Sequence, residues 1–195
     1  MSEPTSNQPQ LDSLNRIQIL TAMGITAIAL LLVSRVWIFF SAVNPLPMFW
    51  ASADLLLGIA IGLGVTVASS LVYLIWPQYR RSADFYLHLI LKPLAWVDLI
   101  WLGLLPGLSE ELLFRGVVLP TLGFNTPALL VSSLFFGVLH FSGSQQWAYV
   151  IWATVIGIVL GLSALATGNL LVPIVAHIVT NLVSSYIWKF RTSQA

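Results

Sequence analysis

Six long apolar segments follow one another between Ile17 and Trp188, separated by short polar turns or turns containing proline and glycine. A helix needs about 20 residues to cross the hydrocarbon core of a bilayer, and lipid leaves its backbone polar groups to be satisfied within the helix. We therefore expect an all-α fold, a polytopic membrane helix bundle of about six transmembrane helices. The expected spans cover about residues 17–43, 52–76, 96–119, 126–142, 147–166 and 170–188.

The composition supports a membrane protein and excludes several other classes. Charged residues make up 8% of the chain and hydrophobic residues 58%, whereas a soluble domain carries about 25% charged residues. A net charge of +1 is too small to indicate nucleic acid as a partner. The chain has no cysteine, which excludes a disulfide, a thiolate metal site and a cysteine nucleophile. The expected surroundings are a lipid bilayer.

The basic residues predict the orientation and the parts of the chain. Arg16, the pair Arg80 and Arg81, and the residues after the last span all fall on one side of a six-span arrangement, so both termini are expected in the cytoplasm. The polar residues 1–16 are expected to be a disordered tail. Residues 17–84 would hold two N-terminal transmembrane helices and a basic loop at 77–84, residues 85–95 an interfacial helix, and 191–195 a short tail.

The stretch SEELLFRG, residues 109–116, places three charges inside the third expected span. Glu111 and Arg115 are four residues apart on one helical face and can form an ion pair. Glu110 points about 100° away and has no partner within its own helix. A charge at the centre of a membrane helix costs roughly 2.5–3.5 kcal/mol, so Glu110 is expected to face the bundle interior, where it could take and return a proton.

Two further polar pairs lie on later apolar segments. Phe136 and His140 form an F-x-x-x-H pattern, and His177 and Asn181 form an H-x-x-x-N pattern. Each pair alone is typical of hydrogen bonding between membrane helices. Together with Glu110 they supply a carboxylate base, two imidazoles and an amide, which are groups that activate water, bind a metal or stabilise an oxyanion. We therefore predict that the three segments converge.

The ordered set E-E-x-x-x-R, F-x-x-x-H and H-x-x-x-N resembles the CPBP family, also called the Abi family, of CAAX proteases and bacteriocin-processing intramembrane endopeptidases. The resemblance covers about residues 96–190 and makes 85–190 the expected protease core. It implies that Glu110 is the general base that activates water, assisted by His140. It further implies that His177 and Asn181 stabilise the oxyanion, with Glu111 and Arg115 as a supporting pair.

The resemblance also implies a cofactor, a substrate class and a location. The family is usually classed as metalloproteases, so Glu110, His140 and His177 are candidate ligands of Zn²⁺. A metal-independent glutamate mechanism is the alternative, and the same residues serve both. The expected substrate is a protein or peptide at the membrane. Prenylated CAAX cleavage is an open question because prenylation is eukaryotic, whereas a short chain with compact loops suggests a prokaryotic inner membrane.

Two other functions stay open from the sequence. A proton-coupled transporter also places Glu and His inside a helix bundle, and a non-proteolytic scaffold or immunity protein could keep these residues for folding alone. One geometric difficulty concerns the depth of His140. At 1.5 Å per residue, the expected limits of the fourth span place His140 about 10 Å nearer the cytoplasmic edge than Glu110. A joint site therefore requires this span to be shorter or to lie deeper than the sequence suggests.

Overall fold

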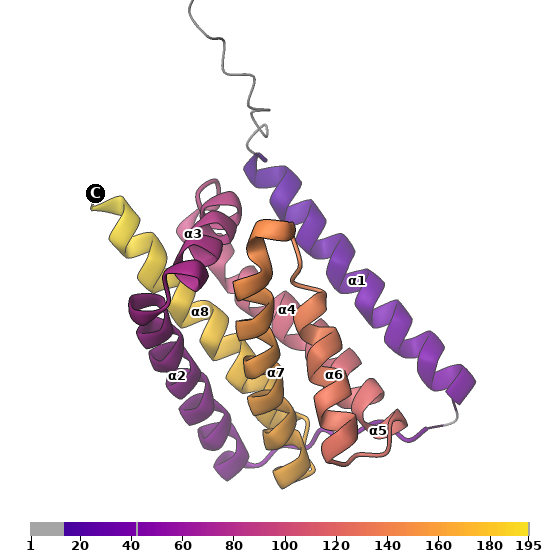
Figure 1. The fold of residues 1–195 in the computed structure, drawn as a ribbon. Helices are drawn as coiled ribbons and strands as arrows, with labels where there is room; N and C mark the ends of the chain where they lie inside the picture. The colour runs from indigo at the N-terminus through magenta and orange to yellow at the C-terminus, as the bar shows by residue number, and fades with distance from the viewer. Residues whose placement is uncertain (1–13, 42, 195) are drawn as a thin grey trace, which may run out of the picture.

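The computed structural model describes residues 14–41 and 43–194, and every regular element in these ranges is helical. The all-α bundle predicted from the sequence is confirmed (Figure 1). Short 3₁₀ turns at Trp96–Asp98 and Ser144–Gln146 and a π-helical turn at Phe114–Val118 interrupt or join the α-helices. The α-helices are α1 (Arg16–Ser41), α2 (Ser52–Ile75), α3 (Pro77–Leu91), α4 (Leu99–Leu113), α5 (Leu119–Thr121), α6 (Thr126–Val138), α7 (Trp147–Thr167) and α8 (Leu171–Ser193).

Four helices of the described chain, α1, α2, α7 and α8, are long and apolar enough to cross a membrane. A fifth span results if α3 and the segment Trp96–Thr121, which are bent by 110° relative to each other, are counted together. The predicted fourth span over 126–142 is wrong in its limits, because α6 has 13 residues and ends at Val138. Length and composition therefore support four or five full-length spans in the described chain, rather than six.

The predicted ends of two other segments also need correction. The expected basic loop at 77–84 is helical, because α3 begins at Pro77, a residue whose fixed φ and missing N–H suit the first turn of a helix. Arg80 and Arg81 therefore lie on a helix. At the C-terminus, α8 continues to Ser193, so most of the predicted tail 191–195 is helical. The predicted disordered tail 1–16 lies outside the described residues up to position 13, and α1 begins at Arg16.

Glycines set the spacing of the central helices. A Cβ atom added to Gly62 would lie 2.6 Å from the Ala176 carbonyl oxygen, and one added to Gly58 would lie 2.8 Å from Val175 Cβ, so α2 and α8 are in backbone contact. Gly103 and Gly107 of α4 approach a second face of α8, where their nearest neighbours are the side chains of Leu182 and Ile178 at 2.5 Å. These pairs are G-x-x-x-G sequences, which allow close approach of membrane helices. Close packing on two faces makes α8 the central helix.

The end of the bundle that carries both described termini is fixed by basic side chains. Arg16 forms a two-pronged ion pair with Asp98, at 2.7 and 2.8 Å, and so ties the start of α1 to the start of α4. Lys189 of α8 donates to the carbonyl oxygens of Leu91 at 3.1 Å and Leu94 at 2.5 Å. Leu91 is the last residue of α3 and Leu94 lies in the turn that follows, where the end of a helix leaves carbonyl groups free to accept further hydrogen bonds. Lys189 thus has a structural role at this end.

The opposite end is closed by the loop between α1 and α2, which runs along the bottom of the bundle in Figure 1. Leu46 of this loop is buried in an apolar cluster, and its backbone N–H donates to the Gly116 carbonyl at 2.9 Å. The π-helical turn widens the backbone around Gly116, so the loop supplies a partner to a carbonyl within this turn. The other buried members of the cluster are Leu119, Ala128, Leu129, Ala164, Leu170 and Ile174.

Candidate functional site

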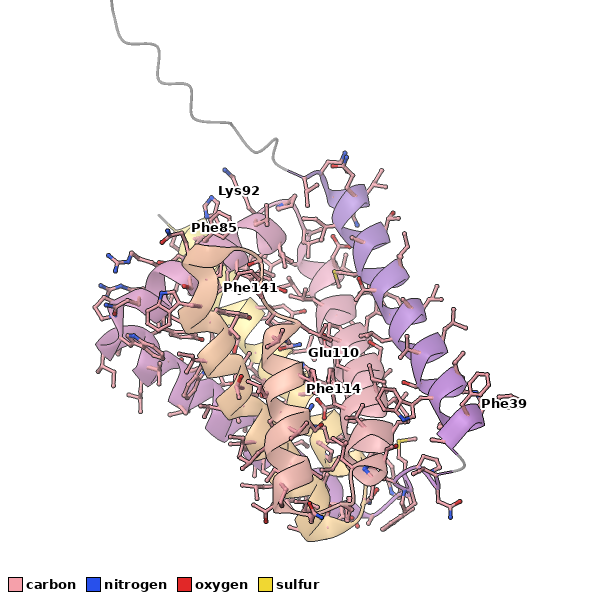
Figure 2. All side chains as sticks on the ribbon, turned by 45° about the vertical axis from the view of Figure 1, so that its right-hand side comes forward. Phe39, Phe85, Lys92, Glu110, Phe114 and Phe141 are labelled. Atoms are coloured by element: carbon pink, nitrogen blue, oxygen red, sulfur yellow. The ribbon has the colours of Figure 1, made fainter. Side chains whose placement is uncertain are left out.

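Glu110 lies near the end of α4 with its carboxylate in the bundle interior. Figure 2 shows it at mid-height between the helices, whereas Phe39 projects from the outer side of α1. Its side chain is 16% exposed, and its Oε2 atom is buried without a hydrogen-bond partner among the described residues. The nearest basic atom recorded is His140 Nε2, 3.9 Å away. That separation is too long for a direct hydrogen bond and suits one bridging water.

His140 reaches Glu110 because α6 is short. The helix starts at the end of the bundle opposite the termini and stops at Val138, so its end lies at mid-depth, with His140 in the following turn. The Nδ1 atom of His140 lies 2.9 Å from the Phe136 carbonyl oxygen. A carbonyl can only accept, so Nδ1 carries the proton and Nε2 presents its lone pair toward Glu110. The F-x-x-x-H spacing thereby fixes the tautomer of His140. The depth difference of about 10 Å that the sequence suggested between His140 and Glu110 is wrong, because the two side chains lie 3.9 Å apart.

Glu111 forms the predicted pair with Arg115, and the pair is fully buried. Arg115 Nη1 lies 2.8 Å from Glu111 Oε1, and the side chains are 1% and 0% exposed. Arg115 Nη2 also donates to the Gly157 carbonyl at 2.7 Å, and the guanidinium carbon lies 4.5 Å from the centre of the Phe136 ring. The π-helical turn that contains Arg115 follows directly after α4. A segment of this kind inside a helix is frequent at functional sites.

Glu111 has a second partner that sequence reasoning missed. His177 Nδ1 of α8 lies 2.8 Å from Glu111 Oε1. A carboxylate that holds one ring nitrogen fixes the imidazole orientation and leaves Nε2 available to other groups. No local spacing could have indicated this contact, because the two residues are 66 positions apart. The buried ion pair therefore also orients one of the candidate site residues.

One cleft, of about 290 Å³, collects all four side chains predicted as catalytic: Glu110, His140, His177 and Asn181. His177 and Asn181 are one turn apart on α8. The structure thus brings together residues from α4, the turn after α6, and α8. Hydroxyl groups of α2 and α8 and aromatic side chains of α3 also line the cleft, together with residues of α4 and α7. The predicted convergence in space is observed, whereas the chemical roles stay predictions.

A tyrosine cluster beside His140 was also missed. The Tyr149 ring lies 6.1 Å from the His140 ring, 4.9 Å from Tyr86 and 6.2 Å from Tyr79, measured between centroids. Tyr86 lies on α3, outside the four long spans, and burial together with the nearby Glu110 carboxylate raises its pKa to about 12. Its phenol therefore stays a neutral hydrogen-bond donor at physiological pH.

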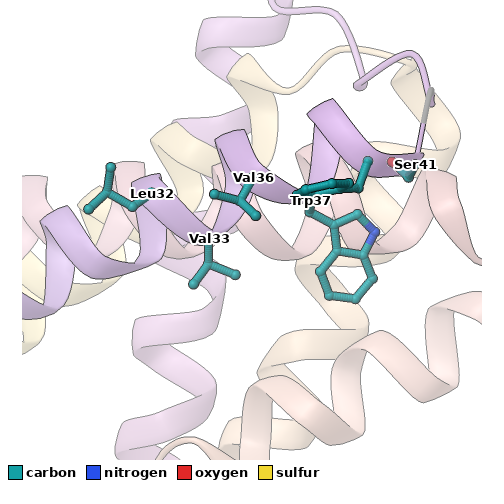
Figure 3. A pocket seen from close by; sticks show the side chains of 6 residues that line it. Leu32, Val33, Val36, Trp37 and Ser41 are labelled. Carbon is teal, nitrogen blue, oxygen red and sulfur yellow. The ribbon is translucent and has the colours of Figure 1, made fainter.

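A larger hollow, of about 510 Å³, lies along α1 (Figure 3). Its lining is almost wholly apolar and contains no acid, histidine or basic residue. It therefore offers none of the groups that the predicted chemistry requires. The residues that line it are Leu32, Val33, Val36, Trp37, Phe40 and Ser41.

The site contains the types of donor group that a zinc ion binds, but these groups are not gathered closely around one point. Two imidazoles with Nδ1 engaged and Nε2 exposed to the cleft, together with a carboxylate, are the donor set of catalytic zinc sites. However, within residues 14–41 and 43–194 no three His, Cys, Asp or Glu side chains gather closely enough to hold an ion. The candidate ligands Glu110, His140 and His177 therefore do not form a metal site in this arrangement.

Fold and site together define a class: a polytopic membrane protein with a Glu–His–His–Asn cleft inside the bundle. Residues 92–183 match the family model of type II CAAX prenyl endopeptidase, Rce1-like. The chain is also 32% identical over 148 residues to the uncharacterized protein YpbD of Bacillus subtilis (strain 168), covering 74% of this chain and 76% of the relative. No solved structure matches the chain. The chain belongs to the CPBP family of CAAX-type intramembrane proteases, as predicted from its motifs.

Proposed function

We propose that the chain is an endopeptidase that hydrolyses a peptide bond of a membrane-associated protein, with Glu110 as the general base. The observation that supports this most directly is the unpaired Oε2 atom of Glu110, which faces His140 Nε2 across 3.9 Å. A water between these atoms can donate one proton to each acceptor, so that its oxygen lone pair points into the cleft. His177 and Asn181 line the same cleft.

The reaction follows from these positions. Glu110 takes a proton from the water as the oxygen bonds to the carbonyl carbon, and the carbonyl electron pair moves to its oxygen. Asn181 can donate to this oxyanion through its amide N–H. His177 can donate from Nε2 when both ring nitrogens carry a proton, since Nδ1 faces Glu111. Glu110 then delivers its proton to the peptide nitrogen, the C–N bond breaks, and an amine and a carboxylic acid leave.

Two versions of this mechanism use the same residues, one with Zn²⁺ and one with the glutamate alone. The metalloprotease assignment rests on the resemblance, and the donor types of Glu110, His140 and His177 are compatible with it. The separation of these side chains favours the metal-free version. We therefore propose that the protein's own carboxylate supplies the basicity for water activation.

We propose that the protein resides in a prokaryotic inner membrane with both termini in the cytoplasm, and that the cleft takes a peptide segment from that side. The start of α1 and the end of α8 lie at the same end of the bundle (Figure 1). Arg16, Arg80, Arg81 and Arg191 gather toward that end, which agrees with the positive-inside rule. Whether the substrate carries a prenyl group is a separate question that substrate identification will decide.

The experiment compares the N- and C-terminal peptides of the proteome in cells that carry the wild type or Glu110→Gln. A protease is expected to yield new termini only with the wild type, while both proteins insert into the membrane in equal amount. Arg81→Gln, which changes a charge outside the cleft, is the matched control and is expected to behave as the wild type. A scaffold or immunity protein would keep its cellular phenotype as Glu110→Gln and would produce no new termini.

The transporter alternative receives less support from the fold. Transport needs a polar path through the whole bundle, whereas the apolar cluster around Leu46 fills the end opposite the termini. Flux of protons through vesicles that contain the purified protein would nevertheless reveal such a path. We expect none above the level of empty vesicles.

A further inference from the structure

The cleft extends along α8 well beyond the candidate catalytic residues. His177, Asn181, Ser184, Trp188 and Arg191 all line it. Their spacings of four, three, four and three residues place them in one stripe along a single face of α8. The stripe begins at the acid and imidazole groups inside the bundle and ends at Arg191, in the last turn of the helix. Arg191 thus stands at the outer end of the cleft, and among the described residues it is the lone Lys or Arg in its lining.

Arg191 lacks structural partners of the kind that hold two other basic residues of this end, Arg16 and Lys189. Arg16 is paired with Asp98, and Lys189 is bonded to two backbone carbonyls. No ion pair of Arg191 is found within the described part of the chain. The carboxylate of Asp84 accepts a hydrogen bond from Tyr73 at 2.7 Å, not from Arg191. The guanidinium of Arg191 is exposed and can therefore receive a ligand.

The length of the stripe sets the distance between this cation and the reaction. Ten residues of helix separate Asn181 from Arg191, which corresponds to about 15 Å at 1.5 Å per residue. An extended peptide advances about 3.3 Å per residue, so four or five residues cover this distance. The Arg191 side chain can extend or fold back, which widens the range to roughly three to five residues.

We propose that Arg191 is a specificity-determining residue, which binds a carboxylate of the substrate three to five residues from the bond that is cut. The inference rests on the proposed function, since it needs a peptide in the cleft. A guanidinium matches a carboxylate with two parallel hydrogen bonds and keeps its charge at any physiological pH. In the part of the chain that the structure describes, the remaining lining between Arg191 and the catalytic residues is uncharged, so a single anionic group at the outer end would fix the register of the peptide.

The carboxylate can come from an Asp or Glu side chain or from the C-terminus of the substrate. A peptide series separates these sources. The parent is a peptide that the purified protein in nanodiscs cleaves, taken from the proteomic comparison. Its variants carry Glu or Gln at single positions from two to six residues on either side of the cut, each made as the free acid and as the C-terminal amide.

The expected result is a preference that depends on both charge and position. Charge-assisted hydrogen bonds are stronger than neutral ones, and for this exposed site we expect a roughly tenfold higher kcat/KM for Glu over Gln at the favoured position. Arg191→Gln should abolish this preference by lowering kcat/KM for the Glu peptide toward that for the Gln peptide. Arg191→Glu should prefer a Lys at the same position, a reversal that mere structural damage cannot produce. Arg81→Gln should retain the wild-type preference.

Several outcomes would overturn the proposal. Equal cleavage of Glu and Gln peptides at every position and at both termini by the wild type would show that no carboxylate is bound. An equal loss on charged and neutral peptides in Arg191→Gln would assign Arg191 a structural role. An effect of Arg191→Gln that changes with the anionic lipid content of the nanodisc, but not with peptide charge, would assign it to a lipid phosphate. If the wild type cleaves no peptide at all, the proposed function itself fails.

Discussion

The Nδ1 atom of His177 and the Arg115 guanidinium share one acceptor, the Oε1 atom of Glu111, each at 2.8 Å. Glu111 thus links the end of α4 to α8 and to the π-helical turn at a point where all three side chains are buried. The same oxygen neutralises Arg115 and orients His177. We therefore expect the Arg115 contact to affect stability and the His177 contact to affect activity, so that the two effects can be separated by mutation.

Glu111→Leu is expected to destabilise the protein by about 3–5 kcal/mol, since it leaves the Arg115 charge buried without compensation. The double variant Glu111→Leu with Arg115→Met replaces both charges by apolar groups and should regain most of this stability. It should still lose activity by roughly tenfold to a hundredfold, because His177 Nδ1 has lost the acceptor that orients it. Thermal unfolding in detergent and peptide cleavage measure the two effects. A double variant with full activity would contradict the orienting role.

Glu110→Gln should lower kcat by about 10²–10⁴-fold, the usual contribution of a general base. Its melting temperature should stay within a few degrees of the wild type, because the Oε2 atom has no hydrogen-bond partner to lose in the described structure. The amide has nearly the same shape as the carboxylate, so cleft geometry is preserved. The two quantities should be measured on the same preparation. Inactivity that accompanies a large loss of stability would instead indicate a structural role.

Metal removal should leave the reaction intact under the proposed mechanism. Incubation with a zinc chelator, followed by gel filtration, is expected to change kcat/KM by less than about twofold, because the base is a protein carboxylate. Elemental analysis of the purified protein should find far less than one zinc per chain. A loss of activity that added Zn²⁺ restores would establish the alternative mechanism, with Glu110, His140 and His177 as ligands.

The sequence predicted which side chains gather in the cleft better than it predicted where each helix ends. The polar pairs on α4 and α8 could be assigned to helical faces from spacing alone, since helix periodicity is a local property. The depth of His140 could not, because it depends on where α6 begins and ends, and apolar sequence continues through the turn that contains His140. Helix limits inside uniformly apolar sequence are poorly determined by local preferences.

Contacts between distant segments were the second gap. The Glu111–His177 contact joins residues far apart in sequence, and the tyrosines beside His140 come from α3 and α7. Such contacts follow from helix packing, which the G-x-x-x-G sequences of α2, α4 and α7 could have indicated. Gly58 and Gly62 form one of these, and they place α2 directly against α8. This pattern is a local sequence signal that α2 lies beside α8 at the site.

The contact of α2 with α8 leads to a prediction with an internal control. A methyl group at Gly62 would meet the Ala176 carbonyl oxygen at 2.6 Å, whereas one at Gly64 has nothing within 4 Å. Gly62→Ala should destabilise the bundle by about 1–3 kcal/mol, the usual range for overpacking, because backbone atoms cannot move aside as a flexible side chain can. Gly64→Ala, two residues along the same helix, should be neutral or slightly stabilising, since alanine is the better helix former.

The separation of α2 and α8 also sets the width of the cleft, to which α2 contributes Ser69 and Ser70 and α8 contributes His177 and Asn181. Gly62→Ala should therefore raise KM for peptide cleavage as well as lower the melting temperature. Equal melting temperatures for the two variants would show that this close approach does not hold the helices together.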